Sequence, residues 1–149
     1  MHKFLKWIAT GFNVGFVPNA PGTFGTLVAI PIVLITLNFS IFFKFLLFIA
    51  MFIIGIIASE YYQHYYEKED PAEVVIDEIV AYYFIMIFVP YNLLNLILAF
   101  FIFRFFDILK PYPIKNVENS VKGGVGIMLD DILAAIYTLI IILVLRLFI

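Results

Sequence analysis

The sequence predicts an all-α membrane protein, a single domain over residues 1–149 built as a polytopic helical bundle with about five membrane-embedded helices. Hydrophobic residues make up 64% of the chain and charged residues 13%, against roughly 45–50% and about 25% in soluble domains. A soluble fold of this length could not bury so much apolar side chain. Two apolar stretches, Ile41–Ala58 and Ile132–Ile149, reach the roughly 17–25 residues that a helix needs to cross a bilayer.

Five helices are expected, and three of them are short for a full crossing. In chain order they are about Phe24–Leu37, Ile41–Ala58, Asp77–Pro90, Leu93–Phe106 and a fifth that starts at Asp130 or Asp131. The first begins after a turn-forming segment rich in proline and glycine. The second is followed by the polar stretch Ser59–Glu73. We expect the first, third and fourth helices to be tilted, partly interfacial or re-entrant.

Residues 79–106 could form one long helix or a hairpin that turns at residues 90–92. The positive-inside rule favours the hairpin, because it collects most of the basic residues on one side of the membrane. That side receives Lys3, Lys6, Lys68, Arg104, Lys110, Lys115 and Lys122, and the other side receives Lys44 and Arg146. The same hairpin puts all eleven acidic residues on the basic side.

Charge and cysteine content exclude several classes of function. The formal net charge is -2, so the chain has no basic footprint for nucleic acid. It has no cysteine, which excludes disulfides, thiolate metal sites and cysteine nucleophiles. Neither glycine-rich segment contains the G-x-x-x-x-G-K-[ST] pattern of a P-loop. We therefore expect no nucleic-acid partner and no thiol chemistry.

Five carboxylates stand where the apolar segments of three expected helices meet water. They are Asp77, Glu78, Asp107, Asp130 and Asp131. Helix capping and the helix dipole favour an acid in a first turn, which accounts for Asp77 or Asp130 alone. Capping explains a pair of acids poorly, since a cap needs one side chain. It does not explain Asp107, which is expected at the C-terminal end of a helix.

Acids gathered in this way repel one another unless a cation joins them. An oxygen-rich cluster with no histidine or cysteine partner suits a hard cation such as Mg²⁺. The pattern therefore predicts a magnesium site with Asp77, Glu78, Asp107, Asp130 and Asp131 as its ligands.

Basic residues flank the same region, and basic side chains are usual partners of phosphate oxygens. Lys68 and Lys122 are more simply explained as contacts to anionic head groups. Arg104 stands three residues before Asp107, so the two share a helix face. We expect Arg104 to bind phosphate or to orient Asp107.

Two glycine-rich segments precede expected helices, Pro21–Thr26 (PGTFGT) and Gly123–Gly126 (GGVG). Each places flexible backbone beside a helix N-terminus, where N–H groups can receive an anion. Glycine before a helix is more often simply part of a turn, so this signal alone is weak.

The polar stretch carries a Glu60–His64 pair at i,i+4 spacing, which is typical of a solvated helix face. Six tyrosines are typical of an interfacial aromatic belt. They are Tyr61, Tyr62, Tyr65, Tyr66, Tyr82 and Tyr83.

Four blocks of the chain together resemble the signatures of one family. They are GFNVGFVPNAPGTFGT (Gly11–Thr26), VVIDE (Val74–Glu78), IFRFFDILKPYPIK (Ile102–Lys115) and KGGVGIMLDDILA (Lys122–Ala134). In content and order they are similar to the phosphatidylglycerophosphatase A family. One position departs, since Ala81 stands where members often have glycine.

The resemblance implies a multi-pass enzyme of the bacterial inner (cytoplasmic) membrane with its active site facing the cytoplasm. The implied reaction is the Mg²⁺-dependent hydrolysis of phosphatidylglycerophosphate to phosphatidylglycerol and inorganic phosphate. Five residues are then expected to be catalytic: Asp77, Asp107, Asp131, Arg104 and Lys110. Four are expected to bind substrate: Thr23, Gly25, Lys115 and Gly124.

Two chemistries stay open, a metal-activated water and an aspartate acting as a covalent nucleophile. The main rival from another class is a divalent-cation transporter, which would need its acids near the membrane midplane. An inactive membrane relative is the third alternative. The sequence leaves the number of metal ions, the lipid range and the oligomeric state open.

Overall fold

The computed structural model describes residues 2–148, which form helices joined by turns and loops, with no strand among them. The elements are α1 (His2–Ala9), a 3-10 turn η1 (Val14–Phe16), α2 (Pro21–Ile35), α3 (Ile41–Tyr66), α4 (Ile76–Phe88), α5 (Leu93–Leu109), α6 (Ile114–Ser120) and α7 (Gly123–Leu145). The predicted all-α class is confirmed. The described residues form seven α-helices where the sequence predicted five, because the short helices α1 and α6 were not predicted.

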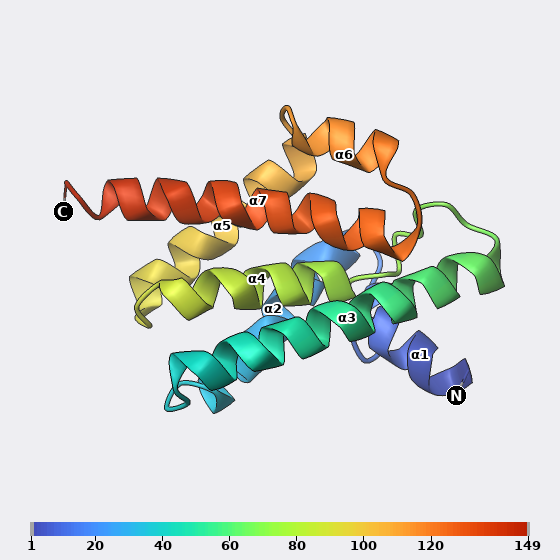
Figure 1. Ribbon diagram of the computed structural model, residues 1–149, viewed down its shortest axis with the longest axis horizontal. Coiled ribbons are helices and arrows are strands. Elements are labelled where there is room, and N and C mark those ends of the chain that lie inside the picture. Colours follow the sequence, from blue (N-terminus) through green and yellow to red (C-terminus); the bar gives the residue numbers. More distant parts are fainter. Residues whose placement is uncertain (1, 149) are drawn as a thin grey trace.

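Helix α4 lies at the centre of the bundle. Figure 1 shows α3, α4 and α7 running side by side along the long axis, and α4 contacts α2, α3, α5 and α7. Its side chains are buried on nearly every face, including Ile79, Val80, Tyr82 and Ile85. The helix that carries Asp77 and Glu78 is therefore held in place from several sides.

Two helices, α3 and α7, are long and apolar enough to cross a membrane by length and composition. Their positions agree with the two predicted apolar stretches, although Ile149 lies outside the described residues. Only 11% of the apolar window of α3 is buried inside the protein, against 44% of that of α7. Much of the apolar surface of α3 thus faces outward. The membrane embedding of α2, α4 and α5 stays a prediction.

The turn between α4 and α5 confirms the hairpin. Helix α4 ends at Phe88, and the side chain of Asn92 accepts a hydrogen bond of 2.8 Å from the Asn95 N–H at the start of α5. The Asn95 side chain donates to the carbonyl of Pro90 at 2.7 Å. Residues 79–106 are therefore two helices.

The two ends of the molecule differ in charge. Figure 1 places the N-terminus, the α3–α4 connection and α6 toward one end, and the α2–α3 turn, the α4–α5 turn and the C-terminus at the other. We call these the charged end and the apolar end. Lys44 and Arg146 are the basic residues near the apolar end.

The predicted start of the last helix, at Asp130 or Asp131, was wrong, since α7 begins at Gly123. Gly123 turns the chain with a φ of 78°, and the N–H of Gly124 donates to the Glu60 carboxylate of α3. The apolar residues 125–129 are then helical. Asp130 and Asp131 lie about two turns inside α7, so neither is an N-cap.

The predicted tyrosine belt was wrong for half of its members. Tyr62, Tyr82 and Tyr83 are buried in the core, with 2% or less of their surface exposed. Tyr82 donates a hydrogen bond of 2.8 Å to the Leu96 carbonyl and so joins α4 to α5. Tyr61 and Tyr65 keep more exposed positions at the charged end of α3.

Candidate metal centre

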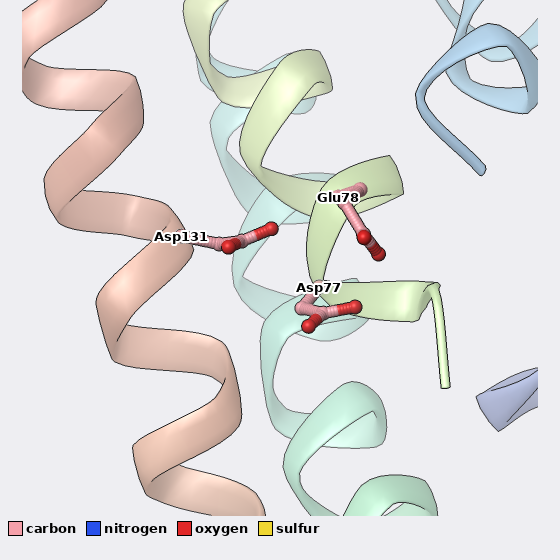
Figure 2. Close-up of side chains that lie close together, drawn as sticks. All are labelled: Asp77, Glu78 and Asp131. Carbon is pink, nitrogen blue, oxygen red and sulfur yellow. The ribbon is translucent and has the colours of Figure 1, made fainter. Parts of the chain in front are cut away.

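Three carboxylates from α4 and α7 converge at one point. Asp77 and Glu78 stand in the first turn of α4, and Asp131 faces them from α7. One carboxylate oxygen from each lies within 4.8 Å of those of the other two. Figure 2 shows Asp131 reaching from α7 toward α4, with Asp77 and Glu78 in the first turn of α4. Oxygens bound to one divalent ion lie about 2.1–2.4 Å from the ion, so two of them are at most about twice that distance apart. The spacing of these three oxygens is in that range, so one ion can bind all three carboxylates.

The three carboxylates have oxygens that nothing in the described protein satisfies. Oδ1 of Asp77, Oε2 of Glu78 and Oδ2 of Asp131 are shielded from solvent and have no hydrogen-bond partner. Asp131 as a whole is only 3% exposed. Burying a carboxylate without a partner is costly, and three together also repel one another. These orphaned oxygens fit the coordination of a hard cation.

Arg104 connects the group to Asp107. Its guanidinium forms an ion pair with Asp107 one turn further along α5, and it lies 3.5 Å from Oε1 of Glu78. Asp107 is 9% exposed. The predicted pairing on one helix face is confirmed, and Arg104 also bridges to α4.

A second ion-pair cluster surrounds Lys110 at the end of α5. Its amine donates to Oδ2 of Asp130 at 2.6 Å and to Oε1 of Glu118 at 2.7 Å. Burial alone would lower the pKa of Lys110, but the hydrogen bonds to these two carboxylates outweigh it and raise that pKa above its usual value. Asp130 also accepts the N–H of Asp131 at 3.0 Å. Asp130 therefore has a cationic partner, unlike Asp77 and Asp131.

The structure thus separates the five predicted ligands into two settings. Asp77, Glu78 and Asp131 form the close group, while Asp107 and Asp130 flank it, each held by a base. A surface cavity of about 280 Å³ reaches Asp130 and is also lined by Glu118 and Lys122. This cavity gives the flank of the site an opening at the charged end.

Gly22 is a site residue that sequence reasoning missed. A β-carbon built on Gly22 would lie 2.1 Å from Oε1 of Glu78 and 2.9 Å from Nη1 of Arg104. Only glycine lets the start of α2 approach this pair so closely. The predicted substrate residue Thr23 is the next residue in α2 and is partly buried.

The other three predicted substrate residues lie outside the close group. Gly25 packs against Val75, the residue before α4, where an added β-carbon would lie 2.7 Å from Cβ of Val75. Gly124 gives its N–H to Glu60. Lys115 is exposed near the start of α6. Their roles in substrate binding stay predictions.

Glu118 was also missed by sequence reasoning. It holds Lys110 from α6, eight residues further along the chain. No local pattern links the two, because a cluster of this kind depends on how α6 folds back.

The fold and the site thus define an all-helical bundle with a close group of carboxylates that keeps unpartnered oxygens. Residues 7–146 match the sequence model of the family described as phosphatidylglycerophosphatase A. The chain belongs to this family.

Curated relatives agree with the family. The chain is 42% identical over 147 residues to a putative phosphatidylinositol-3-phosphatase of Bacteroides thetaiotaomicron, covering 93% of this chain and 91% of the relative. It is 37% identical over 137 residues to phosphatidylglycerophosphatase A of Haemophilus influenzae, covering 91% and 84%. It is 36% identical over 135 residues to the Escherichia coli protein of the same name, covering 87% and 76%. No solved structure matches the chain.

Proposed function

We propose that the chain is a Mg²⁺-dependent lipid phosphatase that hydrolyses phosphatidylglycerophosphate to phosphatidylglycerol and inorganic phosphate. The family and two of the relatives carry the name of this activity. The proposal includes a multi-pass position in the bacterial cytoplasmic membrane, with the charged end toward the cytoplasm.

One observation carries the metal dependence: the close group of Asp77, Glu78 and Asp131 with its unpartnered oxygens. The substrate is a phosphomonoester anion, which bare carboxylates would repel. A divalent cation held by the group would turn this repulsion into attraction. The chemistry supplied by bound Mg²⁺ is Lewis acidity toward phosphate oxygens and toward water.

The bases beside the group are placed to act on the transferred phosphoryl group. Arg104 borders the close group through Glu78, and Lys110 borders it through Asp130. Fixed cations near the developing charge lower the barrier of phosphoryl transfer. Asp107 is held by Arg104. It can act in either of two chemistries, by positioning an attacking water or by attacking phosphorus itself as a covalent nucleophile.

Two observations support the proposed membrane position: the apolar surface of α3 and the uneven distribution of charge. Asp77 and Glu78 lie in the first turn of α4 and Asp107 in the last turn of α5, both toward the charged end of the bundle. A transporter would need them near the midplane. This placement favours hydrolysis at the membrane surface over transport.

A second substrate has its own support. The Bacteroides relative is named as a putative phosphatidylinositol-3-phosphatase. It is 42% identical to this chain, and the match covers 93% of this chain. Both lipids present a phosphomonoester beside a diacylglycerol phosphate, so the same centre could take either.

The test is phosphate release by the purified full chain in detergent, with Mg²⁺ present. Phosphatidylglycerophosphate, phosphatidylinositol 3-phosphate and glycerol 3-phosphate are offered separately. The proposal expects phosphatidylglycerophosphate to turn over fastest and the Asp107→Asn variant to release none. Faster release from the inositol lipid would reassign the substrate. No release from either lipid by folded protein would overturn the enzyme proposal.

A further inference from the structure

Helix α1 lies at the charged end of α3 and follows a different direction from the bundle. Figure 1 shows it crossing the end of α3 obliquely. The first 18 residues of α3, Ile41–Ala58, are apolar except for Lys44 in the first turn, and they cover about 27 Å, close to the thickness of a hydrocarbon core. The rest of α3 then projects past that core. The His2 ring packs against Tyr65 in this projecting part, with centroids 3.9 Å apart. This contact places the N-terminal end of α1 beside the part of α3 that projects past the core.

The surface of α1 is divided into a buried and an exposed apolar side. Ala9 is fully buried, and Leu5 and Ile8 pack against the core. On the other side Phe4 is 60% exposed and Trp7 44% exposed. Exposed aromatic side chains at the edge of an apolar core are typical of membrane-interface anchors.

The exposed aromatic surface continues past α1. Phe12 is 50% exposed and Phe16 47% exposed, and the rings of Trp7 and Phe12 meet edge to face at 4.4 Å. Nothing in the described chain covers this surface of four large rings.

Two lysines stand among these rings. Lys3 is exposed, and the Lys6 amine lies over the ring of Phe16 at 5.2 Å and that of Tyr66 at 5.4 Å. A shallow cavity of about 560 Å³ is lined by Lys3, Phe4, Lys6, Trp7 and Asn13, with no acid among them. Within residues 2–148 no ion pair engages either lysine. The cavity is therefore lined by both cationic and aromatic side chains, which complement an anionic head group joined to acyl chains.

We propose that α1 lies at the membrane surface, oblique to it, and that Lys3 and Lys6 bind the phosphate of an anionic phospholipid. Phe4 and Trp7 then insert beside the upper acyl chains of that lipid. The inference rests on the membrane position in the proposed function and is independent of the phosphatase chemistry. Charge complementarity selects the anionic lipid over a second copy of the chain, whose matching surface would bring the same two lysines.

Trp7 is the only tryptophan of the chain, so its fluorescence reports this surface directly. The full chain is reconstituted into phosphatidylcholine vesicles that contain an equal fraction of brominated phosphatidylcholine or brominated phosphatidylglycerol. We expect stronger quenching by lipids brominated near the head group than by lipids brominated near the chain end. We also expect stronger quenching by the anionic lipid than by the zwitterionic one.

Lys3→Gln should reduce the preference for the anionic lipid by up to about fivefold, since one lysine near a membrane surface contributes roughly 1 kcal/mol. Lys44→Gln is the matched control at the apolar end and should leave the preference unchanged. Equal quenching by the two lipids, or equal effects of the two variants, would overturn the lipid-binding inference.

A second tryptophan position, in the apolar part of α3, tests the membrane position of the chain separately from the role of α1. In the Trp7→Phe/Ile49→Trp variant, the probe sits in the middle of the apolar part of α3, at a position 40% exposed. Deep quenching of this probe without lipid quenching of Trp7 would overturn the role of α1 alone. Absence of quenching at both positions would overturn the membrane position as well.

Discussion

Asp131 of α7 and Asp77 of α4 bring carboxylate oxygens to within 4.8 Å of each other, although α5 and α6 separate them along the chain. Neither acid has a base as partner: Arg104 pairs with Glu78 and Asp107, and Lys110 pairs with Asp130 and Glu118. The centre therefore exists only when α4 and α7 are packed together. It is also where two acids, Asp77 and Asp131, are packed in the bundle without a base to balance their charge.

Asp77→Asn and Asp131→Asn should each lower Mg²⁺-dependent phosphate release by at least about 100-fold. Loss of a residue that merely supports a metal ligand costs about 10–100-fold, and a direct ligand should cost more. Helical content by circular dichroism should be unchanged. Asp70→Asn, the same substitution at an exposed acid of the α3–α4 connection, should keep near-normal activity. Equal activity in all three variants would contradict the role of the close group.

Asp131→Asn, which should lower activity, should raise the stability of the protein when no metal is present. Asp131→Asn removes one charge from a buried group of like charges, so the metal-free variant should unfold at a higher temperature than the metal-free parent. Mg²⁺ at about 100 times its Kd should stabilise the parent by roughly 2.7 kcal/mol and the variant by much less. Thermal unfolding in detergent with chelator and with Mg²⁺ measures both effects. A less stable metal-free variant would show that the acids do not repel one another in the fold.

Lys110→Gln should reduce turnover by about 10²–10³-fold if its amine stabilises charge on the phosphoryl group. The matched control is Lys68→Gln, which removes an ion pair with Glu73 away from the centre.

The hydrogen bond from Lys68 lowers the pKa of Glu73, so this pair adds stability at neutral pH that is lost as the pH falls through the lowered pKa. Because both side chains are partly exposed, the loss should stay under about 1 kcal/mol. Similar turnover in the two variants would remove Lys110 from the mechanism.

Gly22→Ala and Gly25→Ala should fail in different ways. A methyl group at Gly22 collides with Glu78 and Arg104, so this variant should fold and lose turnover. A methyl group at Gly25 collides with Val75, so this variant should lose stability, by about 1–3 kcal/mol as in other overpacked cores. Turnover per folded molecule, measured beside thermal unfolding, distinguishes the two. Lost turnover in a stable Gly25→Ala variant would instead support the predicted substrate role of Gly25.

The hairpin and the position of several acids at helix ends could be predicted because both follow from local pattern. Pro90 and Asn92 interrupt an apolar run, and the distribution of basic residues decides the topology. Asp77 and Glu78 lie at the start of their helix as expected, and Asp107 lies in the last turn of its own.

The start of α7 could not be predicted, because the residue that completes it is distant. Two glycines in a row usually end a helix or form a turn. Here the Glu60 carboxylate accepts the N–H of Gly124 from across the α3–α7 contact and so caps the helix. The glycines are required for a different reason, since a β-carbon on Gly124 would lie 2.2 Å from the Ile56 carbonyl oxygen.

The role of Gly22 was hidden for a related reason. A glycine in a sequence shows that a side chain is missing, but not which groups occupy the space left free. The structure fills that space with Glu78 and Arg104. Likewise α1 is too short to be stable alone, and its helical form depends on packing against α3.

The most direct test of the proposed centre is hydrolysis of phosphatidylglycerophosphate by a single preparation in three states. Phosphate release is measured as purified, after chelation of divalent ions, and after Mg²⁺ is returned in excess. The proposed centre predicts that release stops on chelation and recovers with Mg²⁺ in the parent, and never recovers in Asp131→Asn. Continued release after chelation, or full recovery in Asp131→Asn, would contradict a metal held by the carboxylates of α4 and α7.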